Sequence, residues 1–242
     1  MKKFFLLFLI IHAFYFSKSQ VIISLLFGDK LNSEKLVFGL SVSPTLSNIT
    51  NYEANYKFGL GLALFFTLKL NDRFYFQLEA IPKSPYGAKN IRPYPVGDSS
   101  IDNIFKNGSV ERKIKTISLP LLIRYRVGGL WFLETGPQID WMLGGKDIFT
   151  VKSGDNELTN TIKVDDDITR FDIGWASGLV YKFKKDVSMA VGIRYFYGFT
   201  DIIKSTPGTQ RNSAWLLNVY IPIGAGKAAA KRQKESEEKS KL

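Results

Sequence analysis

The stretch YKFGLGLALFFTLKL, residues 56–70, alternates between two kinds of side chain. Its odd positions are mostly small or charged, whereas its even positions are all large and apolar: Tyr56, Phe58, Leu60, Leu62, Leu64, Phe66, Leu68 and Leu70. A period of two residues predicts a β-strand, because successive side chains of a strand point to opposite faces of its sheet. The predicted strand is much longer than the roughly 5–6 residues that are usual in globular sheets.

The same alternation recurs along the chain and predicts eight strands in total. The other seven are centred on residues 36–42, 74–78, 116–127, 131–143, 170–183, 187–199 and 214–223. Three connections are tight turns, at residues 71–73, 128–130 and 184–186. The remaining connections are longer and polar, near residues 48–55, 83–111, 144–168 and 201–211.

Turn length supports this assignment. A three-residue turn keeps the apolar residues of both strands of a hairpin on one side, whereas a slip of one residue would mix the two faces. The expected facing pairs are Leu70 with Phe74, Val127 with Trp131, and Phe183 with Val187.

The two predicted faces differ in size as well as polarity. The apolar face carries large side chains, and the other face carries glycines that suit a crowded interior: Gly39, Gly59, Gly61, Gly136, Gly174, Gly178, Gly192 and Gly198. Short turns at one end and long loops at the other are typical of outer-membrane barrels. We therefore expect an all-β fold, an eight-stranded antiparallel up-and-down transmembrane β-barrel. A soluble lipocalin-like barrel is the alternative, and it would turn its apolar face inward around a ligand.

The N-terminus has the pattern of a secretory signal peptide. Lys2 and Lys3 precede an apolar run, and the small residues Ser17 and Ser19 precede Gln20. We expect a signal peptide over residues 1–19, a short leader over 20–34 that is a helix, a plug or only partly ordered, the barrel over 35–224 and a charged periplasmic tail over 225–242. No later segment has the 18 or more unbroken apolar residues of a membrane helix.

Composition argues against several kinds of chemistry. The chain has no cysteine, and its single histidine, His12, lies in the predicted signal peptide. Disulfides, thiolate metal sites and histidine-dependent catalysis are therefore not expected, and we predict no catalytic, cofactor-binding or metal site. The formal net charge of +11 is diffuse, whereas nucleic-acid binding uses a clustered basic face. The run Asp165–Asp167 lacks EF-hand spacing, so we expect a solvated acidic loop rather than a cation site.

Charged residues also fall on the predicted inner face. Because buried charges are costly without partners, we expect these side chains to form a structural polar network: Arg124, Glu134, Arg126, Asp140, Arg170, Asp172, Arg194 and Glu79. The turn at 128–130 places Arg124 across from Glu134, which predicts an ion pair. An eight-stranded barrel has an interior that side chains just fill, so a packing role is favoured over an ion path.

Three motifs resemble those of a known family. They are Leu119–Leu122, Glu134–Pro137 in an aromatic strand, and Pro222–Gly224 at the end of LNVYIPIG. Together with FGDKLNSEKLVFGLSVSPTLSNI, they make residues 27–224 resemble the PorT-like outer-membrane β-barrel family of Bacteroidota-type bacteria. The resemblance implies an OmpA/OmpX-like eight-stranded barrel. The namesake of the family assists protein secretion, a role that these motifs do not carry over because none of them is catalytic.

The predicted function is that of a non-enzymatic protein of the bacterial outer membrane, with a structural, adhesion or secretion-associated role through long extracellular loops. Expected partners are outer-membrane lipid, the barrel-assembly machinery during biogenesis, and an envelope or secretion-complex protein; no nucleic acid is expected. A narrow channel or transporter barrel is the alternative function, and the soluble ligand-binding barrel is the second one.

Overall fold

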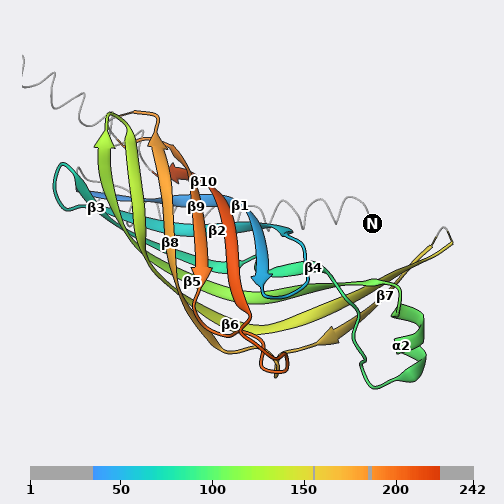
Figure 1. Ribbon diagram of the computed structural model, residues 1–242. Coiled ribbons are helices and arrows are strands. Elements are labelled where there is room, and N and C mark those ends of the chain that lie inside the picture. The colour runs from blue at the N-terminus through green and yellow to red at the C-terminus, as the bar shows by residue number, and fades with distance from the viewer. Residues whose placement is uncertain (1–34, 155, 185–186, 224–242) are drawn as a thin grey trace, which may run out of the picture.

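The computed structural model describes residues 35–154, 156–184 and 187–223, and Figure 1 shows how they are arranged. The elements in chain order are β1 (Leu36–Thr50), β2 (Lys57–Lys69), β3 (Phe74–Ser84), β4 (Gly87–Ile91), α2 (Ser99–Phe105), β5 (Ser109–Gly128), β6 (Trp131–Ser153), β7 (Asn156–Lys163), β8 (Phe171–Lys182), β9 (Ala190–Gly198) and β10 (Arg211–Pro222). The predicted signal peptide, leader and charged tail lie outside the described residues. Within those residues, no helix combines the length and apolar character needed to cross a bilayer.

Eight strands form a closed antiparallel ring. Its order is β1, β2, β3, β5, β6, β8, β9 and β10, and β10 pairs back onto β1. Each ring strand pairs with the next ring strand along the chain, which is an up-and-down topology. Closure removes sheet edges, so the backbone groups of the wall are satisfied within the sheet, as lipid requires. The predicted eight-stranded barrel is confirmed, and each predicted strand overlaps one ring strand.

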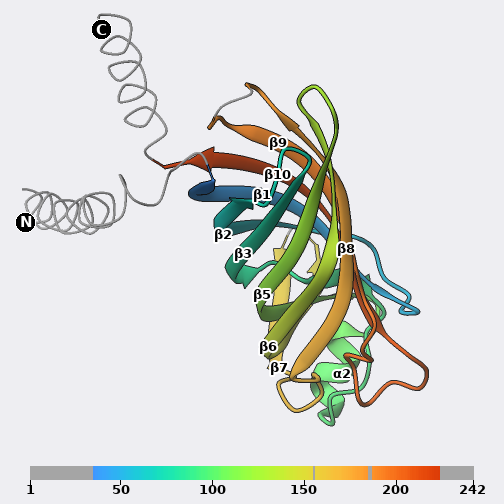
Figure 2. The same ribbon diagram turned by 90° about the vertical axis from the view of Figure 1, so that its left-hand side faces the viewer.

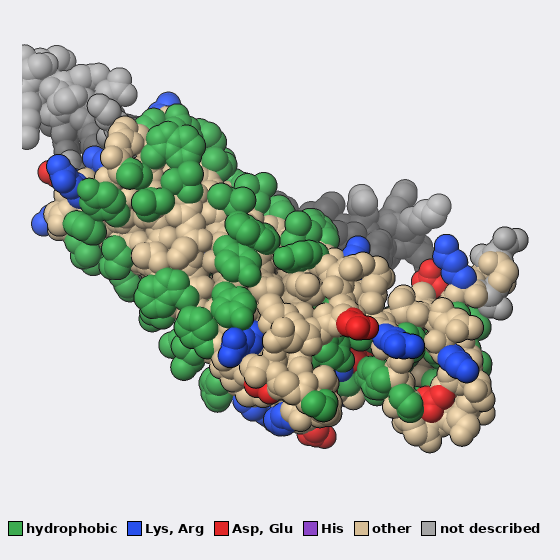
Figure 3. Space-filling model, viewed as in Figure 1, with side chains coloured by type: hydrophobic (Ala, Val, Ile, Leu, Met, Phe, Trp, Pro, Cys, Tyr) green, Lys and Arg blue, Asp and Glu red, His purple; other side chains and the backbone are tan. Residues whose placement is uncertain are grey.

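The apolar side chains of the ring face outward. In β2, the side chains of Phe58 and Leu62 are 65% and 57% exposed, whereas those of Ala63 and Phe65 are 5% and 2% exposed. Figure 3 shows hydrophobic side chains over the barrel wall and charged side chains gathered toward its two ends. A soluble lipocalin-like barrel needs the opposite arrangement, so that alternative is wrong.

The tight turns define the short-turn end of the barrel, and two of the three facing pairs predicted there need correction. The amide of Leu70 donates to Phe74 O at 3.0 Å, in agreement with the prediction. At the next turn Gly128, rather than Val127, pairs with Trp131, because a bulge between Arg126 and Gly128 adds one residue. Between Arg126–Phe132 and Thr116–Met142 the β5–β6 ladder keeps the expected register, and a second shift follows between Thr116 and Lys115.

The third turn is longer than predicted. The amide of Phe183 donates to Met189 O at 3.0 Å, so Phe183 faces Met189 and not Val187. The observed partner, Met189, lies two residues beyond the predicted one, Val187. Because side chains alternate with a period of two, a shift of two leaves the same residues facing lipid.

The opposite, long-loop end is built from regular structure, so the prediction of polar loops at 83–111 and 144–168 is wrong. Beyond the ring, β5 and β6 continue to pair as far as Ser109 and Thr150. There β4 adds to β5 and β7 adds to β6, and the N-cap Asp98 begins α2. We call residues 87–115 and 144–163 the head, which projects from one end of the ring in Figures 1 and 2.

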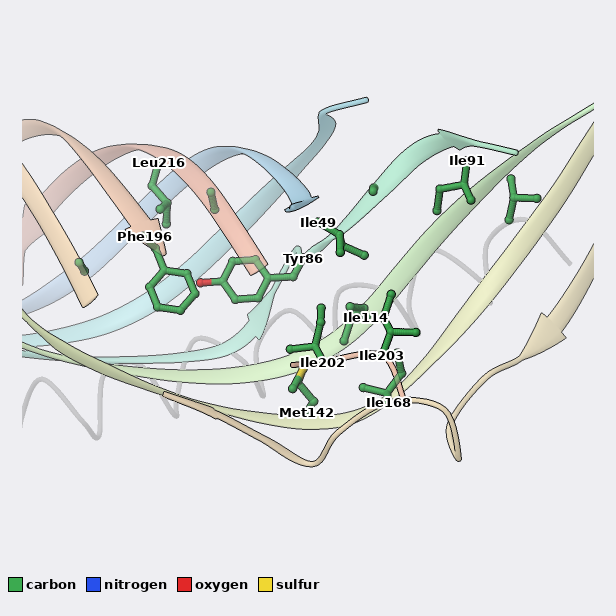
Figure 4. Packing of buried hydrophobic residues seen from close by; sticks show 14 of the residues in the cluster. Ile49, Tyr86, Ile91, Ile114, Met142, Ile168, Phe196, Ile202, Ile203 and Leu216 are labelled. Atoms are coloured by element: carbon green, nitrogen blue, oxygen red, sulfur yellow. The ribbon is translucent and has the colours of Figure 1, made fainter. Parts of the chain in front are cut away.

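Two apolar clusters fill the molecule at different heights. The larger, the distal core, runs from the head-side half of the bore into the head. Figure 4 shows Tyr86 beside Phe196, and their rings are nearly parallel, with centroids 5.7 Å apart. It also holds Ile202 and Ile203 from the β9–β10 loop, both fully buried. The smaller, the proximal cluster, lies toward the short-turn end and consists of Phe65, Phe132, Val180, Ala190 and Tyr220.

Candidate functional site

A network of ion pairs crosses the bore between the two apolar clusters. Arg194 on β9 binds Glu79 on β3 in a bidentate manner, with N–O distances of 2.7 and 2.9 Å. Its Nε also lies 2.7 Å from Glu134 Oε1 on β6. The expected Arg124–Glu134 pair is present at 2.9 Å, and the two residues face each other in the β5–β6 ladder. Two buried arginines are thus balanced by two buried glutamates.

Neighbouring residues complete this network. Tyr220 OH lies 3.0 Å from Glu79 Oε1, and the Tyr220 ring lies under the Arg124 guanidinium, 4.5 Å from its centroid. Gly178 provides space, because a Cβ there would lie 2.5 Å from Ile193 O and 3.1 Å from Glu134 Oε1. Tyr220 is not part of the predicted polar network, although its even position in the last strand places it on the inner face.

A second polar layer contains Asp140 and Asp172 and is separate from the arginines of the network. They face each other in the β6–β8 ladder, and both are fully buried. Gln138 Nε2 donates to Asp140 at 2.9 Å, and Asn212 Nδ2 donates to Asp172 at 3.1 Å. These two aspartates belong to the predicted interior set, and side-chain amide groups are among their hydrogen-bond donors.

The other two residues of the predicted network lie elsewhere. Arg126 sits near the short-turn end, between the rings of Tyr75 and Phe132, and donates to Tyr75 OH. Arg170 is exposed, so its placement in the interior is a wrong prediction. It precedes β8 at the rim, where the backbone bends and alternation no longer determines which way a side chain points.

The head contains a buried polar group that the sequence analysis missed. Arg112 donates to Asp147 at 2.8 and 2.6 Å, and Tyr94 OH donates to the same carboxylate at 2.5 Å. Burial, together with Asp147, raises the pKa of the Tyr94 phenol above its ordinary value, so Tyr94 remains a donor at neutral pH. The alternation before residue 116 could have indicated that Arg112 is buried, because Val110, Arg112 and Ile114 share one face of the strand.

A cavity of about 660 Å³ opens beside this group. It is lined by both aromatic and charged side chains: Tyr52, Glu53, Ile91, Arg92, Tyr94, Pro95, Val96, Arg112, Ile162, Lys163, Val164, Asp166, Asp167, Ser205 and Thr206. The acidic loop folds onto the protein here, since Asp165 accepts from Gly145 N at 2.9 Å and Asp167 accepts from Ser205 N at 2.8 Å. The head therefore offers a concave surface of mixed polarity.

A closed eight-stranded ring with an outward apolar belt and a charged interior defines a transmembrane β-barrel of the outer-membrane class. The chain belongs to the outer membrane protein beta-barrel domain family, whose model matches residues 32–204. The protein is accordingly located in the bacterial outer membrane. No curated protein sequence matches it.

Among solved structures, similar chains include other outer-membrane barrels. The attachment invasion locus protein Ail of Yersinia pestis is 12% identical, with 78% of this chain and 98% of that chain covered and a TM-score of 0.40. Neisserial surface protein A is also 12% identical, covering 77% and 96% with a TM-score of 0.40. OprG of Pseudomonas aeruginosa is 15% identical, covering 77% and 91% with a TM-score of 0.34.

Proposed function

We propose that this protein is a non-enzymatic barrel that presents its head at the cell surface as a binding element and has no open pore. The observation that carries the proposal is the filled bore: the network of Arg194, Glu79, Glu134 and Arg124 lies between two apolar clusters. Because the short turns of outer-membrane barrels face the periplasm, we infer that the head lies on the outside. Surface structure held on a rigid scaffold is where binding residues concentrate.

The finer assignments extend this proposal. Within the family we assign the chain to the PorT-like group, on the motifs at Leu119–Leu122, Glu134–Pro137 and Pro222–Gly224. Export by a cleaved signal peptide and insertion by the barrel-assembly machinery bring it to the membrane. The partner of the head is an envelope or secretion-complex component that fits a cavity lined by tyrosines, arginines and carboxylates.

Conductance separates this proposal from a narrow channel. Purified protein in planar bilayers should show no sustained open level, because ions would have to displace buried side chains of the network. A stable single-channel step present in wild type would overturn the closed-barrel proposal and favour the channel.

The absence of cysteine allows a direct test of orientation. Lys152→Cys places a thiol on the exposed head, and Asp72→Cys places one in the exposed turn at the other end. A maleimide on a polyethylene glycol chain too large for porins should label the first variant on intact cells and the second only after permeabilisation. The reverse pattern would place the head in the periplasm.

The binding role is tested by shortening the head. In the β6–β7 hairpin Thr150 pairs with Thr159, so residues 150–159 can be replaced with an Asn-Gly turn while Arg112 and Asp147 are kept. Both chains are solubilised in mild detergent and checked for a heat-modifiable gel shift. A component recovered with wild type but lost with the shortened chain supports the proposal, and identical recovery contradicts it.

A further inference from the structure

A second cavity, of about 230 Å³, lies at the short-turn end of the bore, far from the head. Arg124 and Arg126 of β5 reach it from one wall, and Lys182 of β8 reaches it from another. The proximal cluster forms its apolar surface, with Phe65, Phe132, Val180, Ala190 and Tyr220 all in the lining. Its volume is just below the roughly 300–1,000 Å³ of pockets for drug-sized ligands, which suits a headgroup with a short apolar segment.

The charge of this cavity has one sign. Among the described residues that line it, five are basic and none is acidic; the basic ones are Lys35, Lys69, Arg124, Arg126 and Lys182. Two of these charges have carboxylate partners outside the lining: Glu134 lies 2.9 Å from Arg124 Nε, and Asp72 lies 2.6 Å from Lys69 Nζ. A concave site lined by one sign of charge concentrates ions of the opposite sign, so the cavity favours anions.

Two arginines that line the cavity each have an N–H group without an acceptor among the described residues. Arg124 Nη2 and Arg126 Nε are both buried, and neither has a hydrogen-bond partner among the described residues. More than nine-tenths of the Arg124 side chain is buried. Buried N–H groups are nearly always satisfied, and an unsatisfied donor carries its full desolvation cost. A bound oxyanion would supply acceptors to both guanidinium groups.

Aromatic rings hold the two guanidinium groups in place. Arg124 lies over Tyr220, 4.5 Å from the ring centroid, and Arg126 lies over Phe132 at 5.4 Å. Tyr75 OH accepts from Arg126 as well. The donors are thus positioned before any ligand arrives. Phe132 and Tyr220 also belong to the apolar lining of the cavity.

We propose that this cavity binds an organic oxyanion, a carboxylate or phosphate monoester that carries a short alkyl chain. Its headgroup contacts Arg124 and Arg126, and its chain lies against Phe65, Val180 and Ala190. The C-terminal segment does not have the complementary charge, because residues 227–242 contain six basic and three acidic residues. The site is independent of the head and of its proposed binding role.

The test uses the full mature chain in nanodiscs of zwitterionic lipid, with empty nanodiscs as background. Isothermal titration with octanoate and with octyl phosphate should show saturable binding at one site per barrel for at least one of them. Octanol, which lacks a charge, tests whether binding needs the anionic headgroup. Inorganic phosphate tests whether binding needs the alkyl chain. Both should bind at least tenfold more weakly; equal binding of either, or no saturable binding of any anion, would overturn the proposal.

Two variants locate the site. Arg126→Gln removes a charge that no carboxylate of the described chain pairs with, and it should weaken anion binding about tenfold. Arg73→Gln makes the same change in the exposed turn at the same end and should leave affinity unchanged. Ala190→Leu fills the cavity while keeping every basic residue, and it should abolish binding. A retained gel shift shows that each variant is folded; equal losses in Arg73→Gln and Arg126→Gln would contradict the assignment.

Discussion

Arg194 on β9 and Glu134 on β6 form a buried ion pair, with Nε 2.7 Å from Oε1. The same arginine holds Glu79, which is 115 residues away in the chain. One guanidinium therefore ties three strands of the ring together across the bore. Both carboxylates are buried. Removing one member of such a pair leaves an uncompensated buried charge, and this cost is larger than the net attraction of the pair.

Replacing Arg194 should destabilise the barrel strongly. Arg194→Met leaves Glu79 with Tyr220 and Gln77 as its hydrogen-bond partners and takes one of two arginines from Glu134. We expect a loss of about 3–5 kcal/mol in the free energy of unfolding, the usual cost of an uncompensated buried charge. Urea unfolding in lipid vesicles measures it. The double variant with Glu79→Gln, which keeps the Arg124–Glu134 pair, should recover part of the loss; no recovery would argue against an electrostatic origin.

The Arg124–Glu134 pair should show direct energetic coupling. In a double-mutant cycle with Arg124→Met and Glu134→Gln, we expect a coupling energy of about 0.5–3 kcal/mol, the range for residues in contact. A matched cycle between Arg124→Met and Asp172→Asn should be additive, because Asp172 bonds to Asn212 and to Thr200 N instead. Equal coupling in both cycles would mean that the two polar layers act as one.

The outward face predicts a contrast between two leucines. Leu62 lies on the lipid-facing side of β2 in the ring, and Leu158 lies on β7 in the head. Both side chains are exposed. Leu62→Arg should cost about 2–4 kcal/mol, as expected for an arginine near the bilayer midplane, whereas Leu158→Arg should have little effect. Folding yield and urea midpoint in vesicles test this; a costly Leu158→Arg would place the head in lipid.

Gly144 marks the junction between the ring and the head. Its φ is +140°, and a Cβ there would lie 2.2 Å from Asp165 Oδ1. Gly144→Ala should therefore displace Asp165 from Gly145 N and cost about 1–3 kcal/mol of local strain, which faster proteolysis within residues 146–168 would reveal. Gly61→Ala, whose Cβ would meet its nearest atom at 3.6 Å, is the control; equal cleavage of both variants would refute the junction role.

Local patterns explain which parts of the site were predictable. Arg124 and Glu134 flank one tight turn, so counting residues outward from that turn places them opposite each other. Arg170 lies just beyond β8, where that counting no longer applies, and it is exposed. The head was missed because β7, NELTNTIK, is largely exposed and has no apolar face to alternate with a polar one. For α2, Asp98 before Ser99 was a helix-start signal that could have been used.

The sequence by itself determined the eight-stranded barrel, because a period of two recurs over eight strands that are joined by tight turns and longer connections. It also placed most of the charged side chains of the bore, with Arg170 as the exception. Only the tertiary structure decided their partners: ring closure brings Glu79 of β3 within 2.7 Å of Arg194 of β9, whereas Asp140 and Asp172 fall in another layer. Partner choice across a bore depends on strand stagger and tilt, and neither is encoded in the alternation of one strand.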